Sequence, residues 1–462
     1  MKIFGWHKQK YRFFGIPILR IKNINENSYY YLFSIKIYKE SCILTKIQHE
    51  FQKHKSFDTR SFDKKITQYL TNLPPRTEET SHMKQNHIAF LASEIYDSGG
   101  HTECIKNLAS SFPKEFESKL FLTRFENSTQ NAPHKIDQIS KYTEIEHANL
   151  TINSLKRGNL SLVMILVKKI IDFEPQTLIS FIHMDDSLGA CILAYIKKHT
   201  DIHIIFWNHG SHYPTLGMSF ADIILEGGET MAQITQKQRG FNNTYTYGLC
   251  YLKEKDIPVF TESQMAKQKE KFGLPSNAIC TMSGGAPYKF FDGDKSSYFE
   301  MIYRLLRNNT NLYHVIISRF SDSEQKTIEQ IFKDTTIKER LIITDLTANY
   351  RLYFKCADLF IDSFPVSSAL TQIDLMSLKV PTLVKINKDD PKLSFHEYLP
   401  NNYPYMSESI ESFERMAQFL INNKKERVRI AEHNYNFFLE TYEGTVAAKK
   451  ILNLIDSIAY KK

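Results

Sequence analysis

The stretch ADLFIDSFPVSSALTQIDLMSLKVPTLV, residues 357–384, decides the fold class. It opens with a short apolar run at 359–361 that ends in Asp362, which is typical of a buried strand. Small hydroxyl residues follow, then an apolar pattern with helical spacing at 370–377 and a second apolar run at 382–384. A strand, a short turn, a helix and another strand form the repeating unit of a parallel sheet, so we predict an α/β protein.

The same alternation continues on both sides of this stretch. Further strands are predicted at 279–282, 314–318 and 340–344, and helices at 297–307, 323–333 and 348–354. A second series has predicted strands at 88–92, 119–122, 177–182, 202–207 and 222–225, and helices at 102–111, 160–173 and 188–199. This pattern indicates two doubly wound Rossmann-like domains facing a cleft, at 87–260 and 270–405. The helical region 406–462 is long enough to cross back to the first domain.

The length and composition support several folded domains. The chain has 462 residues, of which 42% are hydrophobic and 24% charged, so at least two domains are expected and wholesale disorder is excluded. No uncharged apolar run of 18 residues occurs, and no signal peptide is expected. The six cysteines lie far apart without a CxxC pair, which indicates neither a disulfide framework nor a zinc knuckle. We therefore expect a cytoplasmic protein.

The basic charge is concentrated near the N-terminus. Residues 1–86 hold 16 Lys+Arg against 7 Asp+Glu, whereas the remainder holds 43 against 44, which argues against a large nucleic-acid surface. A weak repeat aligns 11–21 with 30–40 at an offset of 19, and both copies read as short strands of a β-rich accessory segment, residues 1–80. Such basic and aromatic strands would suit either peripheral contact with an anionic membrane or a solvated accessory hairpin.

The quoted stretch also contains a candidate anion site. Backbone N–H groups at the predicted helix start, together with Ser367, Ser368 and Thr371, would suit a diphosphate. Asp374 lies within the first two turns of the same helix, where a carboxylate can accept hydrogen bonds from ribose hydroxyls.

These residues resemble the nucleotide-sugar site of GT-B glycosyltransferases, in particular O-GlcNAc transferases and bacterial enzymes similar to them. The resemblance lies in the Phe364-Pro365 pair, the T..D spacing and the preceding Y..ADLF segment, Tyr350 to Phe360. It implies a nucleotide-sugar donor, most simply a UDP-sugar, and catalysis without an obligatory metal. Lys379 stands where the family often has Gly, and residues 357–384 hold no E-x7-E pair, so the resemblance does not decide whether the anomeric configuration is retained.

A second glycine turn follows the first predicted strand of the second half. Gly284 permits close backbone approach, and Lys289 could neutralise a leaving diphosphate, as the basic residue in this place does in GT-B enzymes by resemblance. Arg319, just after the next strand, is a second candidate cation, ranked below Lys289. A surface lysine is the simpler alternative.

Histidines follow two predicted strands of the first half. Gly99, Gly100 and His101 resemble the glycine loop of GT-B N-terminal domains, where His101 could act as a general base on an acceptor or contact the sugar. His209 and His212, in an NH..H element like that of bacterial sugar transferases, could shape the acceptor or sugar pocket. They could also share a metal ion, although no third ligand is evident.

The acidic pairs do not indicate a metal site, because each falls in a predicted loop: Asp185-Asp186, Asp292-x-Asp294 and Asp389-Asp390. P-loop, G-x-S-x-G and H-E-x-x-H motifs are missing from the sequence. We therefore predict a nucleotide-sugar-dependent glycosyltransferase acting on a glycan or lipid-linked acceptor in bacterial surface polysaccharide synthesis. The alternatives are a protein-directed O- or N-glycosyltransferase, an epimerase or sugar phosphorylase of the same architecture, and a non-catalytic GT-B scaffold.

Overall fold

The computed structural model divides the chain into two compact units. Unit 1 comprises Met1–Gly227, Met231–Tyr247 and Ile451–Lys462, and unit 2 comprises Gly228–Thr230 and Gly248–Lys450. The structure describes residues 8–13, 16–24, 27–32, 35–41, 43–70, 83–97, 100–148, 159–247, 249–345, 349–387, 390, 393–394 and 396–459.

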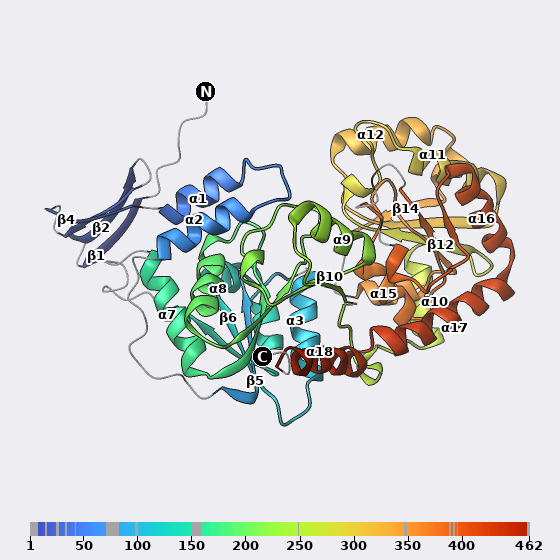
Figure 1. Cartoon of the computed structure of the whole chain (residues 1–462). Coiled ribbons are helices and arrows are strands. Elements are labelled where there is room, and N and C mark those ends of the chain that lie inside the picture. The colour runs from blue at the N-terminus through green and yellow to red at the C-terminus, as the bar shows by residue number, and fades with distance from the viewer. Residues whose placement is uncertain are drawn as a thin grey trace. The chain divides into compact units, whose positions relative to one another are not determined.

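Unit 1 contains a parallel sheet of seven strands in the order β11-β10-β9-β8-β5-β6-β7 (Figure 1). The strands are β5 (Lys84–Ala92), β6 (Glu117–Leu122), β7 (Glu144–His147), β8 (Pro175–Phe181), β9 (His203–Trp207), β10 (Ile223–Glu226) and β11 (Thr244–Thr246). The helices between them are α3 (Gly100–Ser111), α4 (Phe125–Asn131), α5 (Pro133–Ile139), α7 (Asn159–Asp172), α8 (Ser187–His199) and α9 (Glu229–Ile234). The five strands predicted from the sequence are all present.

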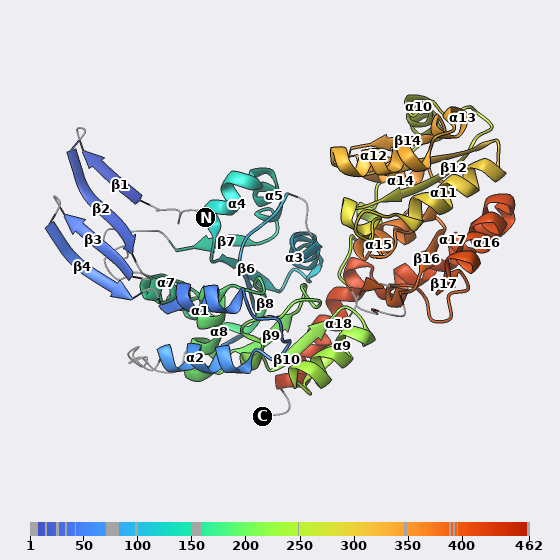
Figure 2. The same ribbon diagram turned by 90° about the horizontal axis from the view of Figure 1, so that it is seen from above.

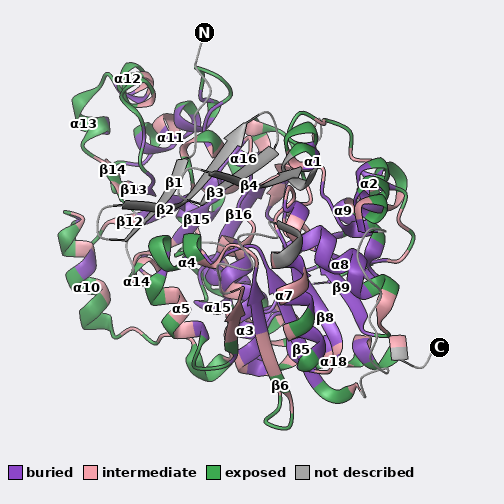
Figure 3. Cartoon of the chain, turned by 90° about the vertical axis from the view of Figure 1, so that its left-hand side faces the viewer, coloured by how far each residue is buried: buried purple, intermediate pink, exposed green. Residues whose placement is uncertain are grey.

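The central strands are buried along their length, as the purple ribbon in Figure 3 shows for β8 and β9. One face of the sheet, which includes Ala89 and Leu91, packs against apolar residues of α7 and α8. Because helices cover them, these strands are continuous apolar runs, which is why the sequence pattern located them.

Two helices precede this sheet, α1 (Ile43–Phe51) and α2 (Arg60–Leu70), and they belong to the same core. Ile47, Phe51 and Ile66 are buried in it, and the carboxylate of Asp63 accepts hydrogen bonds from the backbone N–H of Gly217 (2.8 Å) and the hydroxyl of Ser219 (2.6 Å). The segment predicted as a β-rich accessory over 1–80 is therefore helical over most of residues 43 to 70.

The described residues between Lys8 and Ser41 form an antiparallel sheet of four strands in chain order (Figure 2). They are β1 (Lys8–Phe13), β2 (Ile16–Ile24), β3 (Asn27–Leu32) and β4 (Ile35–Ser41). Each copy of the 19-residue repeat spans parts of two strands, because Phe13 pairs with Ile16 and Leu32 with Ile35, so the prediction of one strand per copy is wrong.

The repeat is a duplicated β-hairpin. Tyr11 pairs with Leu19 in the first hairpin, and Tyr30 pairs with Tyr38, 19 positions later, in the second. The register shift also recurs, after Tyr11 in one hairpin and after Tyr30 in the other.

Unit 2 contains a second parallel sheet, in the order β14-β13-β12-β15-β16-β17. Its strands are β12 (Ile279–Gly284), β13 (Leu312–Ile317), β14 (Leu341–Thr344), β15 (Leu359–Ile361), β16 (Thr382–Lys385) and β17 (Met406–Ser407). The helices are α10 (Glu262–Lys271), α11 (Ser297–Asn308), α12 (Asp322–Ile331), α13 (Thr335–Lys338), α14 (Tyr350–Lys355), α15 (Leu370–Ser377), α16 (Ile410–Asn422) and α17 (Lys424–Thr441). Helix α18 (Gly444–Ala459) begins in unit 2, and its residues from Ile451 onward belong to unit 1. The predicted helix at 370–377 is α15, so residues 357–384 form the expected strand, turn, helix and second strand.

Candidate active site

In unit 2 the strand order reverses between β12 and β15, which are hydrogen-bonded neighbours. Numbered within the unit, the strands follow the order 3-2-1-4-5-6. In such a sheet the loops at the carboxyl ends of the two strands at the reversal diverge and leave room for a ligand. Here these loops carry Gly284, Lys289 and residues 362–368.

Asp362, at the end of β15, organises its own loop. Its carboxylate accepts hydrogen bonds from the backbone N–H groups of Ser363 (2.9 Å) and Ser368 (3.1 Å) and from the hydroxyl of Ser367 (2.6 Å). Burial raises the pKa of Asp362, since water cannot solvate its charge, and these donors and the nearby Lys289 cation oppose that shift. Ser367 and Ser368 are thus brought together as predicted, but these two groups are already engaged by Asp362.

Lys289 joins the two loops. Its ammonium donates a hydrogen bond to the carbonyl of Ser367 (3.0 Å), and burial lowers its pKa. Gly285 makes this approach feasible, because a Cβ there would lie 2.9 Å from Cδ of Lys289. The sequence reading named Gly284, whose carbonyl lies 3.5 Å from the hydroxyl of Ser368, and missed this role of Gly285.

Asp374 lies on α15 and is only 6% exposed. Its carboxylate accepts hydrogen bonds from Nε of Arg351 (2.8 Å) and from the hydroxyl of Tyr350 (3.2 Å). The charge of Asp374 is therefore paired with Arg351 of α14. The sequence contained a signal for this, since both partners lie in the Y..ADLF segment. Thr371, in the first turn of α15, is half-buried.

Arg319 does not join this group. Its side chain is 83% exposed and forms an ion pair with Asp345 at 2.7 Å, just after β14. Strand β13 precedes Arg319 and β14 lies at the sheet edge, so the pair is on the side of β12 away from β15. Of the two predicted cations, the structure brings only Lys289 to the loop of Ser367.

In unit 1 three histidines meet at the carboxyl ends of β5, β8 and β9. The ring centroids of His101 and His209 are 4.8 Å apart and stacked, and the ring of His183 lies 5.6 Å from His101 and 5.9 Å from His209. Strands β5 and β8 are the pair at which the order of this sheet reverses. The structure thus brings two predicted histidines together and adds His183, which the sequence reading missed.

All three imidazoles favour the neutral form. Burial lowers the pKa of His101 to about 4 and that of His209 well below its ordinary value. Burial and the cation of Arg124 lower the pKa of His183. An uncharged imidazole has one nitrogen that donates and one that accepts, so it can form hydrogen bonds with hydroxyl groups such as those of a sugar.

A buried carboxylate holds the loop that carries His209. Glu226 accepts hydrogen bonds from the amide of Asn208 (2.7 Å) and the hydroxyls of Ser211 (2.5 Å) and Thr235, and burial raises its pKa. Nδ1 of His209 is enclosed and has no hydrogen-bond partner among the described residues.

The other predicted residues of unit 1 are less informative. Gly100 is the first residue of α3, and Gly99 lies outside the described residues. His212 is exposed, and its ring packs against Tyr213 at 4.2 Å.

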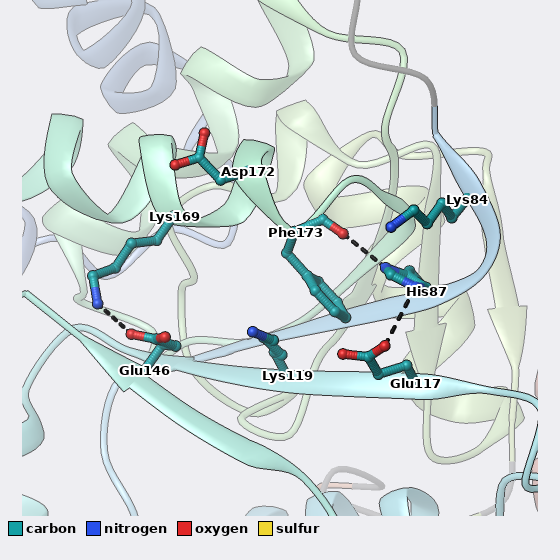
Figure 4. A pocket seen from close by; sticks show the side chains of 8 residues that line it. All are labelled: Lys84, His87, Glu117, Lys119, Glu146, Lys169, Asp172 and Phe173. Carbon is teal, nitrogen blue, oxygen red and sulfur yellow. Dashed lines mark hydrogen bonds and ion pairs between the residues drawn. The ribbon is translucent and has the colours of Figure 1, made fainter.

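A separate pocket of about 380 Å³ lies near the amino ends of β5 and β6 (Figure 4). His87 lines it; its Nδ1 donates a hydrogen bond to the carbonyl of Phe173 (2.8 Å), and its Nε2 lies 3.5 Å from the carboxylate of Glu117. Lys169 and Glu146 form an ion pair at its other side. The pocket is at the end of these strands opposite to the histidines, and its charged groups are engaged in ion pairs, so it is no candidate active site.

Metal ligands are not gathered in the part of the chain that the structure describes, where no three His, Cys, Asp or Glu side chains are placed to hold an ion. Asp186 instead caps α8, accepting from the backbone N–H of Gly189 at 2.9 Å, and Asp389 lies outside the described residues. Within the same described part, no helix has the length and apolarity that a membrane span requires. Five cysteines are buried free thiols: Cys104, Cys191, Cys250, Cys280 and Cys356.

The chain is similar to known proteins in its fold but not in its sequence. No protein-family model matches the chain, and no curated protein matches it by sequence. Solved structures do match. A glycosyltransferase from Rickettsia africae aligns over 82% of this chain and all of its own, with a TM-score of 0.63 and 11% identity. The Anabaena protein Alr3699/HepE, crystallised with UDP and glucose, aligns over 80% of this chain and 99% of its own, with a TM-score of 0.60 and 14% identity.

The chain has the GT-B fold. The resemblance noted in the sequence agrees with a third match, a mutant O-GlcNAc transferase from Thermobaculum terrenum, which aligns over 87% of this chain and 75% of its own, with a TM-score of 0.55 and 11% identity.

Proposed function

We propose that the protein is a glycosyltransferase that uses a nucleotide sugar, most simply a UDP-sugar. The observation that carries this proposal is the Lys289 ammonium held against the carbonyl of Ser367 where the strand order of unit 2 reverses. A half-buried cation at such a reversal suits a diphosphate. The GT-B fold supports the same reading.

Different residues of unit 2 bind different parts of the nucleotide-sugar donor. Lys289 meets the charge of the leaving diphosphate, and Ser367, Ser368 and Thr371 line the phosphate side at the start of α15, with Gly284 allowing close approach. Asp374, held by Arg351, faces the ribose. No metal ion is required in this scheme.

The residues of unit 1 serve the acceptor and the sugar. His101 acts as a general base or contacts the sugar, with Gly99 and Gly100 at its side, and His209 and His212 shape the pocket. In the reaction the acceptor oxygen forms a bond to C1 of the sugar, the bond from C1 to the diphosphate breaks, and UDP leaves with the electron pair.

The acceptor we propose is a glycan or lipid-linked intermediate of bacterial surface polysaccharide synthesis, handled in the cytoplasm at the inner face of the membrane. The first hairpins support a peripheral contact with anionic lipid. Six of the basic residues in their strands are Lys8, Lys10, Arg20, Lys22, Lys36 and Lys39, and the backbone register pairs Lys8 with Lys22 and Lys10 with Arg20.

A thermal-shift panel tests the donor proposal. UDP, other nucleoside diphosphates and their common sugars are added with and without EDTA, since a ligand at a hundred times its Kd stabilises by about 2.7 kcal/mol. We expect a shift with UDP and one UDP-sugar that EDTA leaves unchanged. No shift with any nucleotide would favour a non-catalytic scaffold, and turnover without free UDP would favour an epimerase or phosphorylase.

Vesicle binding tests the membrane contact. Exchange of the six basic residues for Gln should lower binding to phosphatidylserine vesicles at least tenfold, and high salt should do the same. A control exchanges six exposed lysines of unit 2: Lys255, Lys267, Lys271, Lys326, Lys333 and Lys424. Equal vesicle binding by both variants would contradict the proposed membrane contact. Intact masses of co-expressed proteins test the protein-directed alternative, which predicts hexose-sized increments.

A further inference from the structure

Glu94, in the loop after β5, is the centre of a polar cluster in unit 1. Its Oε1 accepts a hydrogen bond from the hydroxyl of Tyr96 (2.8 Å) and lies 3.6 Å from Nδ1 of His183 and 3.7 Å from Nη1 of Arg124. The side chain of Glu94 is buried, so these groups experience its charge with little screening by water.

The three clustered histidines differ in what their ring nitrogens face. Nε2 of His101 is engaged by the carbonyl of Glu94 (3.0 Å), and His101 is 7% exposed. Nδ1 of His209 is enclosed, with no partner in the described part of the chain. Of the three, His183 is the one whose ring nitrogen lies beside a described carboxylate, and it keeps a partly open ring, with 15% of its side chain exposed.

The surroundings of His183 favour one tautomer and hold its ring in position. A carboxylate beside Nδ1 favours the proton on that nitrogen and leaves the lone pair of Nε2 available, as in catalytic triads. The ring stacks on Tyr96 with 5.4 Å between centroids. The backbone N–H of His183 donates to the hydroxyl of Ser93 (2.7 Å), which donates to Asp186 (2.5 Å), so the start of the loop is anchored.

We propose that His183 is the general base of the transfer reaction and that Glu94 is its positioning residue. This inference rests on the proposed glycosyltransferase function. Nε2 takes the proton of the attacking hydroxyl as that oxygen bonds to C1 of the sugar, and UDP departs with the electrons of the breaking bond. His101 then serves as a sugar or acceptor contact.

A hydroxyl activated by a base attacks C1 in a single displacement from the face opposite the leaving UDP. The configuration at C1 is therefore inverted, and a UDP-α-sugar gives a β-product.

The pH dependence follows from the groups around His183. Tyr96, His101, His209, Arg124, Glu94, Asp185 and Asp186 face it. Burial and Arg124 lower the pKa of His183, and the three carboxylates oppose them. The base is thus neutral at pH 7, and the rate should fall as the pH drops through a pKa below 6.5.

The experiment measures UDP release from UDP-glucose, UDP-galactose and UDP-N-acetylglucosamine with water as the acceptor. We expect His183→Asn to lower kcat by about 10²- to 10⁴-fold while UDP affinity stays within threefold. Glu94→Gln should lower kcat and move the acidic limb of the pH profile to lower pH, because a carboxylate that favours the protonated imidazole is lost, and Glu94→Asp should restore part of both. His134→Asn, an exposed histidine of α5, is the control.

Proton NMR of the released sugar should show the β-anomer first. Retained α-configuration, or His183→Asn turnover within threefold of the wild type, would overturn the role of His183 while leaving the glycosyltransferase standing. Absence of UDP release from every donor by the wild type would refute the proposed function, and with it the base.

Discussion

The ammonium of Lys289 donates a hydrogen bond to the carbonyl of Ser367 across 3.0 Å, which ties the loop after β12 to the loop after β15. The two residues are 78 positions apart in sequence. Their contact exists because β12 and β15 are neighbours in the sheet, and it places a cation at the carboxyl ends of both strands.

Lys289→Met should weaken UDP binding by about 10- to 100-fold, since a hydrogen bond to a charged group contributes roughly 1.5–3 kcal/mol. Burial lowers the pKa of Lys289, so affinity should also decline with rising pH earlier than for an ordinary lysine. Titration calorimetry with UDP between pH 7 and 10 measures both effects. Lys295→Met, at an exposed position nearby, should leave the affinity unchanged.

Asp362→Ala should lower the free energy of unfolding by about 3 kcal/mol, because three buried donors from Ser363, Ser367 and Ser368 lose their acceptor. Urea denaturation at pH 7 measures the loss. Asp345→Ala, at a 57% exposed side chain, should change it by no more than about 0.5 kcal/mol. Equal losses in the two variants would contradict the role of Asp362.

Asp374→Ala should both destabilise unit 2 and weaken UDP binding, because it leaves the Arg351 guanidinium without its carboxylate. The second change Arg351→Met should then cost less stability in the Asp374→Ala background than in the wild type. A double-mutant cycle of unfolding free energies should give a coupling of about 1–3 kcal/mol. Additive losses would mean that the ion pair contributes nothing measurable.

Acid should destabilise unit 1 through its histidines. Burial lowers the pKa of His101 from its ordinary value of 6.5 to about 4, so the stabilising contribution of the neutral ring is complete above pH 6.5 and is lost as the pH falls through 4. The loss should reach about 3 kcal/mol. Urea denaturation at pH 7, 5.5 and 4.5 measures the slope, which should be shallower in His101→Gln. Identical slopes would show that His101 does not titrate as inferred.

The sequence predicted the apolar strands and missed two polar strands at the edges of the sheet of unit 1. Strands such as β8 and β9 lie between layers of helices, so they are apolar throughout and can be found by composition. Strands β7 and β11, with sequences EIEH and TYT, lie at the edges of the sheet of unit 1 and are mostly polar. Their pairing with β6 and β10 makes them strands, and no local pattern records it.

The residues of the candidate site were also predictable only in part. His101, His209, Lys289 and Ser368 could be proposed because each follows a predicted strand. His183 could not be proposed from the sequence. Its proposed role depends on contact with Glu94, 89 positions earlier, and with the rings of His101 and His209 from other loops. Arg319 follows a strand as well, yet the tertiary structure pairs it with Asp345.

The sequence by itself determined the alternation of strands and helices, the two α/β halves and the stretch at 357–384, because local apolar patterns and turn residues specify these elements. Only the tertiary structure decided which side chains meet. The reversal of strand order brought Lys289 to Ser367 and gathered three histidines, and the packing of α14 against α15 engaged Asp374 with Arg351. Such contacts depend on strand order and helix packing across the chain, which the spacing of residues along it does not contain.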